Sequence, residues 1–409
     1  MSALPYNCFI VKIGGDSFLR RWGPCGAMLL LTFLSYVDRS VLAILSPTIL
    51  HDLHMTAEQY GWAIFAFSMC YAIANPVWGY WMDRAGLFAT ALLAVGLWSL
   101  ASGGHALVIG VGSLCVARGM LGFGEGAAFP AGLKTVTETL PESRRSLGLG
   151  VAYSGGSLGA AVTPLIVIPL ALHFGWRSAF GLTMFAGLMW AVMWIGMRSF
   201  VRRRSELRVA AATGRPRWSK ALFATVAVYG LGASPLAYGL YAAPLYLTRV
   251  LHVSQGELAH LLWVPPAGWE AGYLFWGWIA DVRRRRGADK LGIFFAAFCC
   301  AGFTVTLLPL AARTTHGVLL TMVLFFVEMF VAGGFIVLAL SDGIVRQGRE
   351  HAGFLAGFCI SCWAIATGLV MPVVGKMFDQ GKFSATLWLV ATLPVVGTAI
   401  WWGITLRER

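Results

Sequence analysis

Long uninterrupted runs of hydrophobic residues, separated by short polar breaks, repeat along the whole chain. Most runs are ~20 residues or longer, which is the length that an α-helix needs to cross the apolar core of a bilayer. The strands of a membrane barrel would instead show alternating segments of about 10 residues. The pattern therefore predicts an all-α membrane protein.

The charged and turn-rich breaks divide the chain into twelve predicted spans. The first six cover residues 22–50, 57–82, 87–108, 111–139, 145–172 and 177–198. The second six cover residues 219–249, 256–281, 289–312, 316–345, 351–378 and 383–405. The only long polar segment lies between the two sets. We therefore expect an N-terminal six-helix bundle in residues 1–200, a linker in 201–218 and a C-terminal six-helix bundle in 219–409.

The two predicted bundles share a short pattern. Gly79 and Asp83 stand at the end of the second span, and Gly277 and Asp281 stand at the end of the eighth, each 198 residues further on. Internal repeats of this kind are expected of transporters that are built from two similar bundles.

Composition agrees with a membrane protein. Of the 409 residues, 58% are hydrophobic and 12% are charged, whereas soluble proteins carry about 25% charged residues. The net charge of +13 would favour a nucleic-acid partner in a soluble protein. Here the basic residues lie in short loops without interleaved aromatic residues, so we expect the lipid bilayer and no nucleic acid as a partner. The eight cysteines lie nearly all in apolar runs and predict neither disulfides nor a metal site.

The basic residues also predict the orientation. Twenty-three of the 31 Lys and Arg residues fall on one side of the predicted membrane, five fall on the other, and three fall inside spans. Basic loops stay in the cytoplasm. The rule places both termini and the linker in the cytoplasm, and we expect the protein in the plasma (inner) membrane.

Four charged residues lie at membrane depth, namely Asp38, Arg39, Arg118 and Glu125. Facing lipid, they would together cost roughly 10–14 kcal/mol. Arg118 and Glu125 are two helical turns apart, about 10.5 Å, which is too far for a direct pair. Asp38 and Arg39 point about 100° apart and are free to meet charges on other spans. The four residues form either a permanent ion-pair network or a substrate and proton site.

Several stretches of the first half resemble the major facilitator superfamily and, within it, the anion:cation symporter family, which includes galactonate and hexuronate transporters and sialin. They are "SYVDRSVLAILSPTI", "YGWAIFAFSMCYAIANPVWGYWMDRAG", "ARGMLGFGEGAAFPAGLKTVTETLPESRRSLGLG" and "HFGWRSAF". The second half matches through "YAAPLYL" and "GLVMPVVGKMFD". This chain departs from the family at Gly156, where its sugar-acid transporters often have an amide, and at Ser361 and Ile365, where asparagines are common.

The resemblance implies roles for the buried charges. Arg39 would hold the substrate carboxylate, and an arginine suits this role because it keeps its charge. Asp38 and Glu125 would carry the proton, and Arg118 would be the movable partner of these acids. Burial disfavours the charged form of an acid, so a buried carboxylate can take up a proton near neutral pH.

Further residues are predicted to bind the substrate or to gate access to it. Tyr36 and Tyr71 match tyrosines of the family's cavity and could donate hydroxyls, although packing is an equal alternative. Glu270 and Ser361 complete the predicted substrate site. At the cytoplasmic side, Asp83 and Asp281 are expected to cap helix ends. Their candidate partners are Arg144 and Arg145.

Together these observations predict a proton-coupled symporter that imports a small organic anion, a sugar acid or related carboxylate, by alternating access. We expect a monomer without a cofactor, driven by the proton gradient. An anion exchanger or exporter on the same fold is the alternative, which the lack of the superfamily's antiporter motif in the fifth span disfavours. An enzyme is not expected, because no serine–histidine, H-E-x-x-H or paired-aspartate arrangement lies at membrane depth.

Overall fold

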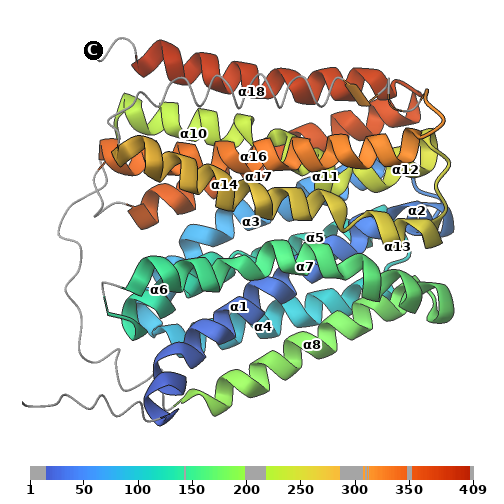
Figure 1. Cartoon of the computed structure of the whole chain (residues 1–409). Coiled ribbons are helices and arrows are strands. Elements are labelled where there is room, and N and C mark those ends of the chain that lie inside the picture. Colours follow the sequence, from blue (N-terminus) through green and yellow to red (C-terminus); the bar gives the residue numbers. More distant parts are fainter. Residues whose placement is uncertain are drawn as a thin grey trace, which may run out of the picture.

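The computed structural model describes residues 15–141, 144–198, 218–285, 307–308, 311, 313–347 and 352–405. Helices are the only regular elements within these residues (Figure 1). The predicted ninth span, 289–312, lies almost entirely outside them, and so does the predicted linker apart from its last residue. Asp281 lies in a helix, but its side chain is outside the described part.

The helices of the N-terminal half follow the predicted spans closely. They are α1 (Gly15–Ile44), α2 (Ser46–Asp52), α3 (Ala57–Ala85), α4 (Leu87–Gly104), α5 (Val111–Glu125), α6 (Ala128–Thr139), α7 (Arg145–Phe174) and α8 (Trp176–Gly196), with a short 3₁₀ turn, η1 (His105–Leu107), after α4.

The helices of the C-terminal half are α10 (Lys220–Gly232), α11 (Ser234–Tyr241), α12 (Ala243–Val250), α13 (Gln255–Leu261), α14 (Val264–Arg285), α16 (Gly317–Gln347), α17 (Ala352–Asp379) and α18 (Phe383–Thr405). Eight helical segments of the described residues are long and apolar enough to cross a membrane. Large hydrophobic side chains such as Ile73, Leu100 and Leu274 are more than half exposed on their outer faces, as lipid-facing residues would be.

Four predicted spans are divided into shorter helices in the structure. The first span breaks between α1 and α2, the fourth between α5 and α6, the seventh at both ends of α11, and the eighth between α13 and α14. Prolines explain several breaks, because proline lacks the N–H group that a helix interior needs but is favoured in its first turn. Pro47, Pro235 and Pro244 each stand at the start of a new helix.

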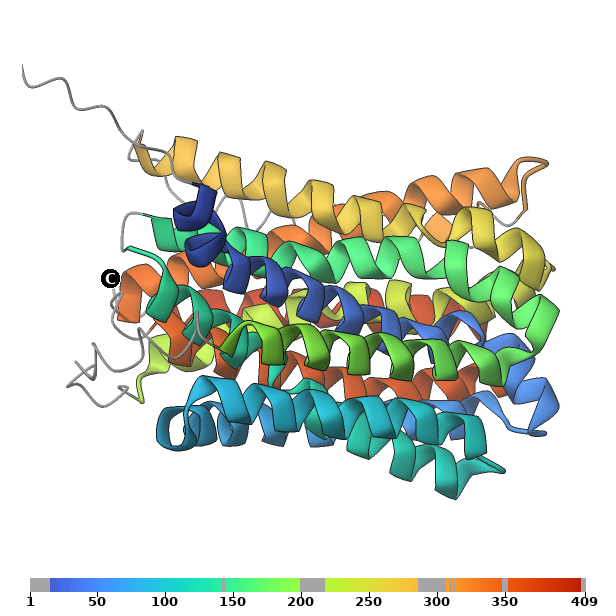
Figure 2. The same cartoon turned by 90° about the horizontal axis from the view of Figure 1, so that it is seen from below.

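The long helices run side by side and give the molecule two distinct ends (Figures 1 and 2). At one end α1 begins, α8 ends, α10 begins and α18 ends; we call it the linker end. The opposite end carries α2, α12 and α13; we call it the far end. Helices α3 and α17 pack against one another along the boundary between the two halves. Helix α3 begins and α17 ends at the far end.

Candidate functional site

The adjacent charges of α1 point to different neighbouring helices. Arg39 faces Glu125 at the end of α5, whereas Asp38 faces Ser102 near the end of α4. Asp38 and Arg39 are 1% and 2% exposed, and Glu125 is fully buried. Three of the four predicted charges therefore lie inside the N-terminal half, shielded from lipid, with partners that belong to other helices.

Arg39 and Glu125 form a buried ion pair. The Arg39 Nη2 and Nε atoms lie 3.0 Å and 3.3 Å from the same oxygen, Oε2, of Glu125. Ser35, one turn before Arg39, donates a third hydrogen bond to that oxygen at 3.0 Å. The other oxygen, Oε1, has no hydrogen-bond partner among the described residues. One side of the Glu125 carboxylate is thus fully engaged and the other is free to accept a proton.

Aromatic rings surround the Arg39 guanidinium. Its central carbon lies 4.7 Å from the ring centroids of Tyr36 and Tyr71 and 4.9 Å from that of Phe67. Rings at such distances stabilise a cation through the negative charge of their faces. These rings hold Arg39 in place, so Tyr36 and Tyr71 already contact the residue that is predicted to bind the anion.

Asp38 is bound by hydroxyls in place of an arginine. Its Oδ1 accepts a hydrogen bond from Ser102 at 2.6 Å, and the Ser102 oxygen lies 2.6 Å from the hydroxyl of Thr183 in α8. Its Oδ2 has no partner within the described part of the chain. Hydroxyls can both donate and accept, so this arrangement tolerates either the charged or the neutral form of Asp38.

Arg118 is a buried cation whose donors are not used. It is completely buried, and none of its three guanidinium nitrogens has a hydrogen-bond partner among the residues that the structure describes. Its central carbon lies 4.8 Å from the ring centroid of Phe67, the ring that Arg39 also contacts. Arg118 is therefore close to the ion pair of Arg39 and Glu125 while its own donors remain available.

The glycines of α5 set this geometry. A Cβ atom added at Gly122 would lie 2.3 Å from the carbonyl oxygen of Phe67, so only glycine lets α5 approach α3 this closely. Helix α5 then ends at Glu125, and a short break precedes α6. This close packing brings Arg118 and Phe67 together and places Glu125 opposite Arg39.

The predicted substrate residues of the C-terminal half bind to the N-terminal half in this conformation. Ser157 of α7 donates a hydrogen bond to Oε2 of Glu270 in α14. The Ser361 hydroxyl of α17 donates to the carbonyl oxygen of Ala72 in α3, at 3.1 Å. Both residues thus lie at the boundary between the halves, where a substrate would have to replace these contacts.

The departure at Gly156 has a structural consequence. A Cβ atom at this position would lie 2.9 Å from the ring of Tyr36. The tyrosine ring therefore occupies space that a larger side chain would need. Tyr36 also packs against Trp269 of α14, with ring centroids 5.4 Å apart.

A small pocket lies beside α1, where Ser40, the residue after Arg39, is part of its lining. Its lining is mostly apolar and comes from both halves: Ser40, Ile44, Ala160, Gly239, Leu240, Pro244, Leu262 and Pro266.

The predicted partners of Asp83 differ from the observed one. Asp83, at the linker end of α3, pairs with Lys134 of α6. Arg145 instead donates to the carbonyl oxygen of Thr137, where it satisfies the end of α6. Arg144 is exposed just before α7. Lys134 lies within the predicted fourth span, and its long side chain reaches Asp83 near the end of α3.

The hydroxyl partners of the acids are not among the predicted site residues. Ser35 lies four residues before Arg39 on the same helical face, so its spacing could have revealed it. Ser102 and Thr183 come from separate spans with no charge nearby, and no local pattern marks them.

Comparisons with known proteins extend over most of the chain. The Major Facilitator Superfamily matches residues 28–369. A hexuronate transporter of Escherichia coli (strain K12) is 27% identical over 410 residues, covering 94% of each chain. A galacturonate transporter of Dickeya chrysanthemi is 29% identical over 280 residues, covering 63% of this chain and 81% of that protein.

The structure has a similar neighbour among solved proteins. A bacterial homolog of the human lysosomal transporter Spinster superposes with a TM-score of 0.80 at 14% identity, covering 96% of this chain and 98% of that one. The predicted fold, two six-helix bundles, is confirmed. The chain belongs to the Major Facilitator Superfamily, and it is a multi-pass membrane transporter, not an enzyme.

Proposed function

We propose that this transporter is a proton-coupled symporter that imports a small organic anion, a sugar acid or related carboxylate, by alternating access. The observation that carries the proposal is the buried ion pair of Arg39 and Glu125, since it joins a permanent cation to an acid that can bind a proton. The names of its relatives, which are hexuronate and galacturonate transporters, support a sugar acid as the substrate. We place the linker end in the cytoplasm, because the basic residues gather there, and the protein in the plasma (inner) membrane.

The ion pair couples the two ligands through competition. While Glu125 is charged, its carboxylate occupies two nitrogens of Arg39. A proton on Glu125 removes that charge and weakens the pair. The guanidinium must then find another anion, since an unpaired buried cation is costly. A substrate carboxylate fits this role because guanidinium and carboxylate can form two parallel hydrogen bonds.

Asp38 and Arg118 complete the cycle. We assign Asp38 as a second proton carrier because its Oδ2 is unpartnered within the described residues. Arg118 neutralises whichever acid loses its proton, since its nitrogens have no hydrogen-bond partner among the described residues and it lies beside Phe67, the ring that Arg39 also contacts. Two arginines and two ionised acids have a net charge of zero. Each proton taken up therefore adds one positive charge, which one negative charge of the substrate can balance.

The other predicted residues take supporting roles in the proposal. The hydroxyls of Tyr36 and Tyr71 and the boundary residues Glu270 and Ser361 would contact the polar body of the substrate. At the linker end, Asp83 would belong to a cytoplasmic gate. The further members of this gate would be Asp281, its counterpart in the internal repeat, and two arginines, Arg144 and Arg145.

The test is transport by Glu125→Gln in proteoliposomes, with galacturonate as the first substrate. Glutamine resembles only the protonated acid, so the variant should still exchange substrate across the membrane. It should lose accumulation driven by an inward proton gradient, by about tenfold or more, because it releases no proton inside. Glu138→Gln is the matched control, since Glu138 is an acid of the same predicted span that contacts Lys134 outside the site.

The outcomes separate the alternatives. Gradient-driven accumulation by Glu125→Gln at the wild-type level would exclude Glu125 as the coupling residue. Exchange without driven uptake in the wild-type protein would instead establish the exchanger. A loss of both activities in a folded variant would move the proton assignment to Asp38.

A further inference from the structure

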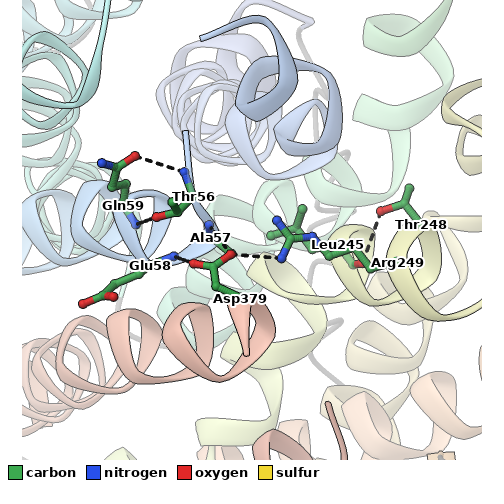
Figure 3. A network of polar contacts seen from close by, with 8 residues as sticks. All are labelled: Thr56, Ala57, Glu58, Gln59, Leu245, Thr248, Arg249 and Asp379. Atoms are coloured by element: carbon green, nitrogen blue, oxygen red, sulfur yellow. Dashed lines mark hydrogen bonds and ion pairs between the residues drawn. The ribbon is translucent and has the colours of Figure 1, made fainter. Parts of the chain in front are cut away.

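Asp379, the last residue of α17, joins the two halves at the far end (Figure 3). Its Oδ1 accepts the backbone N–H of Ala57 at 2.9 Å, and its Oδ2 accepts that of Glu58 at 2.8 Å. Both amides belong to the first turn of α3 in the N-terminal half. Arg249, in the last turn of α12, donates to the same Oδ1 at 3.1 Å.

The carboxylate completes a helix cap that α3 lacks on its own. The first backbone amides of any helix have no partner inside it. In α3, Thr56 and Gln59 satisfy each other through a capping box. That box leaves the amides of Ala57 and Glu58, which are the two groups that Asp379 binds. The backbone amides at the N-terminus of α3 thus find hydrogen-bond acceptors partly in the N-terminal half and partly in the C-terminal half.

Close packing of α3 and α17 brings the short aspartate side chain within reach. A Cβ atom at Gly375, one turn before Asp379, would lie 2.1 Å from the carbonyl oxygen of Ala57. A Cβ atom at Gly61 would lie 2.5 Å from that of Met371. The two backbones therefore touch on either side of the cap, and this contact cannot persist if the halves move apart here.

Other bonds cross the boundary close to this cap. Gln255 of α13 donates to the Ile44 carbonyl and accepts from the Thr48 hydroxyl, each at 3.0 Å. The Tyr60 hydroxyl donates to the carbonyl of Tyr241 at 2.9 Å. Tyr60 lies one turn after Ala57, so the capped turn of α3 also contacts the end of α11.

We infer that Asp379, held by Arg249, closes a gate at the far end by capping α3 from the opposite half. This set, namely Asp379, Arg249 and the amides of Ala57 and Glu58, is called the far-end gate below. The inference rests on the proposed alternating access, in which the far end must open to admit substrate. Opening breaks both cap bonds together, and water then solvates the freed groups, so the closed state is favoured but remains reversible.

The ion pair and the cap contribute differently to the gate. The side chains of Arg249 and Asp379 are 31% and 27% exposed, and pairs that are this accessible to water contribute little by themselves. The carboxylate also meets the positive end of the α3 dipole. The cap is therefore the main contact, and Arg249 positions it.

Hydrogen–deuterium exchange of the full-length protein in lipid nanodiscs tests the gate without any substrate. In Asp379→Ala, exchange in segments 46–62 and 240–256 should rise about tenfold as the far end opens. Exchange at the linker end, in segment 134–141, should fall, because one end closes as the other opens. Fraying of a merely structural cap would instead raise exchange only in the first turn of α3 and would overturn the gate.

Matched variants sharpen the result. Asp52→Ala removes an acid of the same end that pairs with Arg177 within one half, also at 3.1 Å, and should leave exchange at both ends unchanged. Arg249→Ala keeps the cap and should shift exchange less than Asp379→Ala. Asp379→Asn keeps one acceptor and should lie between wild type and alanine. Equal shifts in Arg249→Ala and Asp379→Ala would overturn the cap as the main contact. The proposed function can fail independently, since no transport is measured here.

Discussion

The two ends of the molecule use the same short pattern in opposite ways. At the linker end of α3, Gly79 is followed four residues later by Asp83; at the far end of α17, Gly375 is followed by Asp379. Asp83 pairs with Lys134 inside its own half. Asp379 crosses to the other half and caps α3. The spacing places an acid at a helix end, and only the opposing helix decides whether that acid joins the halves.

Packing beside each acid shows the same difference. A Cβ atom at Gly79 would meet its nearest neighbour, Pro130, at an ordinary 3.9 Å, whereas one at Gly375 would collide with the Ala57 backbone. Described ion pairs of the linker end stay within one half, including that of Arg346 with Asp342. This conformation is thus closed by specific bonds at the far end, which is the outer face in the orientation that we propose.

The largest effect is expected from filling the tight contact. In Gly375→Leu, the new side chain has no room against Ala57 and should force α3 and α17 apart at the far end. Overpacking costs about 1–3 kcal/mol, so exchange in segment 46–62 should rise by about fivefold to more than a hundredfold. Driven uptake should fall accordingly, because the far end no longer closes.

Gly357→Leu provides the comparison on the same helix. Gly357 lies near the linker end of α17, and nothing described lies within 4 Å of a Cβ atom placed there. This variant should resemble the wild-type protein in exchange and uptake. Similar defects in both variants would mean that α17 tolerates leucine nowhere, and the contrast between the ends would be lost.

The sequence predicted the depth of the charges but could not predict their partners. Burial of Asp38, Arg39, Arg118 and Glu125 follows from the apolar runs that contain them. The pairing of Arg39 with Glu125 depends on how α1 and α5 are rotated against each other. That rotation is set by contacts such as Gly122 against Phe67, between residues far apart in the sequence. No spacing of residues within one helix indicates this rotation.

The far-end gate illustrates the same limit. Asp379 follows an apolar run, which is an ordinary position for an acid at the end of a membrane helix. The amides that it binds lie more than 300 residues earlier in the sequence. The breaks at Pro47, Pro235 and Pro244, by contrast, follow from local backbone chemistry and could have been predicted. Local rules therefore give helix ends, whereas contacts between halves require the assembled bundle.

A smaller effect is expected from removing one bond beside the gate. Tyr60→Phe deletes the hydroxyl that donates to the Tyr241 carbonyl, one of the last carbonyls of α11, which a helix leaves without an internal partner. The loss of a typical buried hydrogen bond should raise far-end exchange about fivefold. Tyr246→Phe, which alters a buried tyrosine of α12, should not. A larger change in the control would assign the effect to packing of this region, not to the bond.

The smallest effect is expected at the linker end, from Lys134→Gln. Lys134 bonds Asp83 and lies 3.7 Å from Glu138, and all three residues belong to the N-terminal half. The Asp83 side chain is 74% exposed, and ion pairs that are accessible to water contribute little to stability. The variant should therefore change exchange at either end by less than about twofold. If Lys134→Gln instead altered far-end exchange as strongly as Asp379→Ala, the Asp83 pair would control the equilibrium between the two ends. Gating would then depend on a contact within one half, and the bonds that cross the far end would be its consequence.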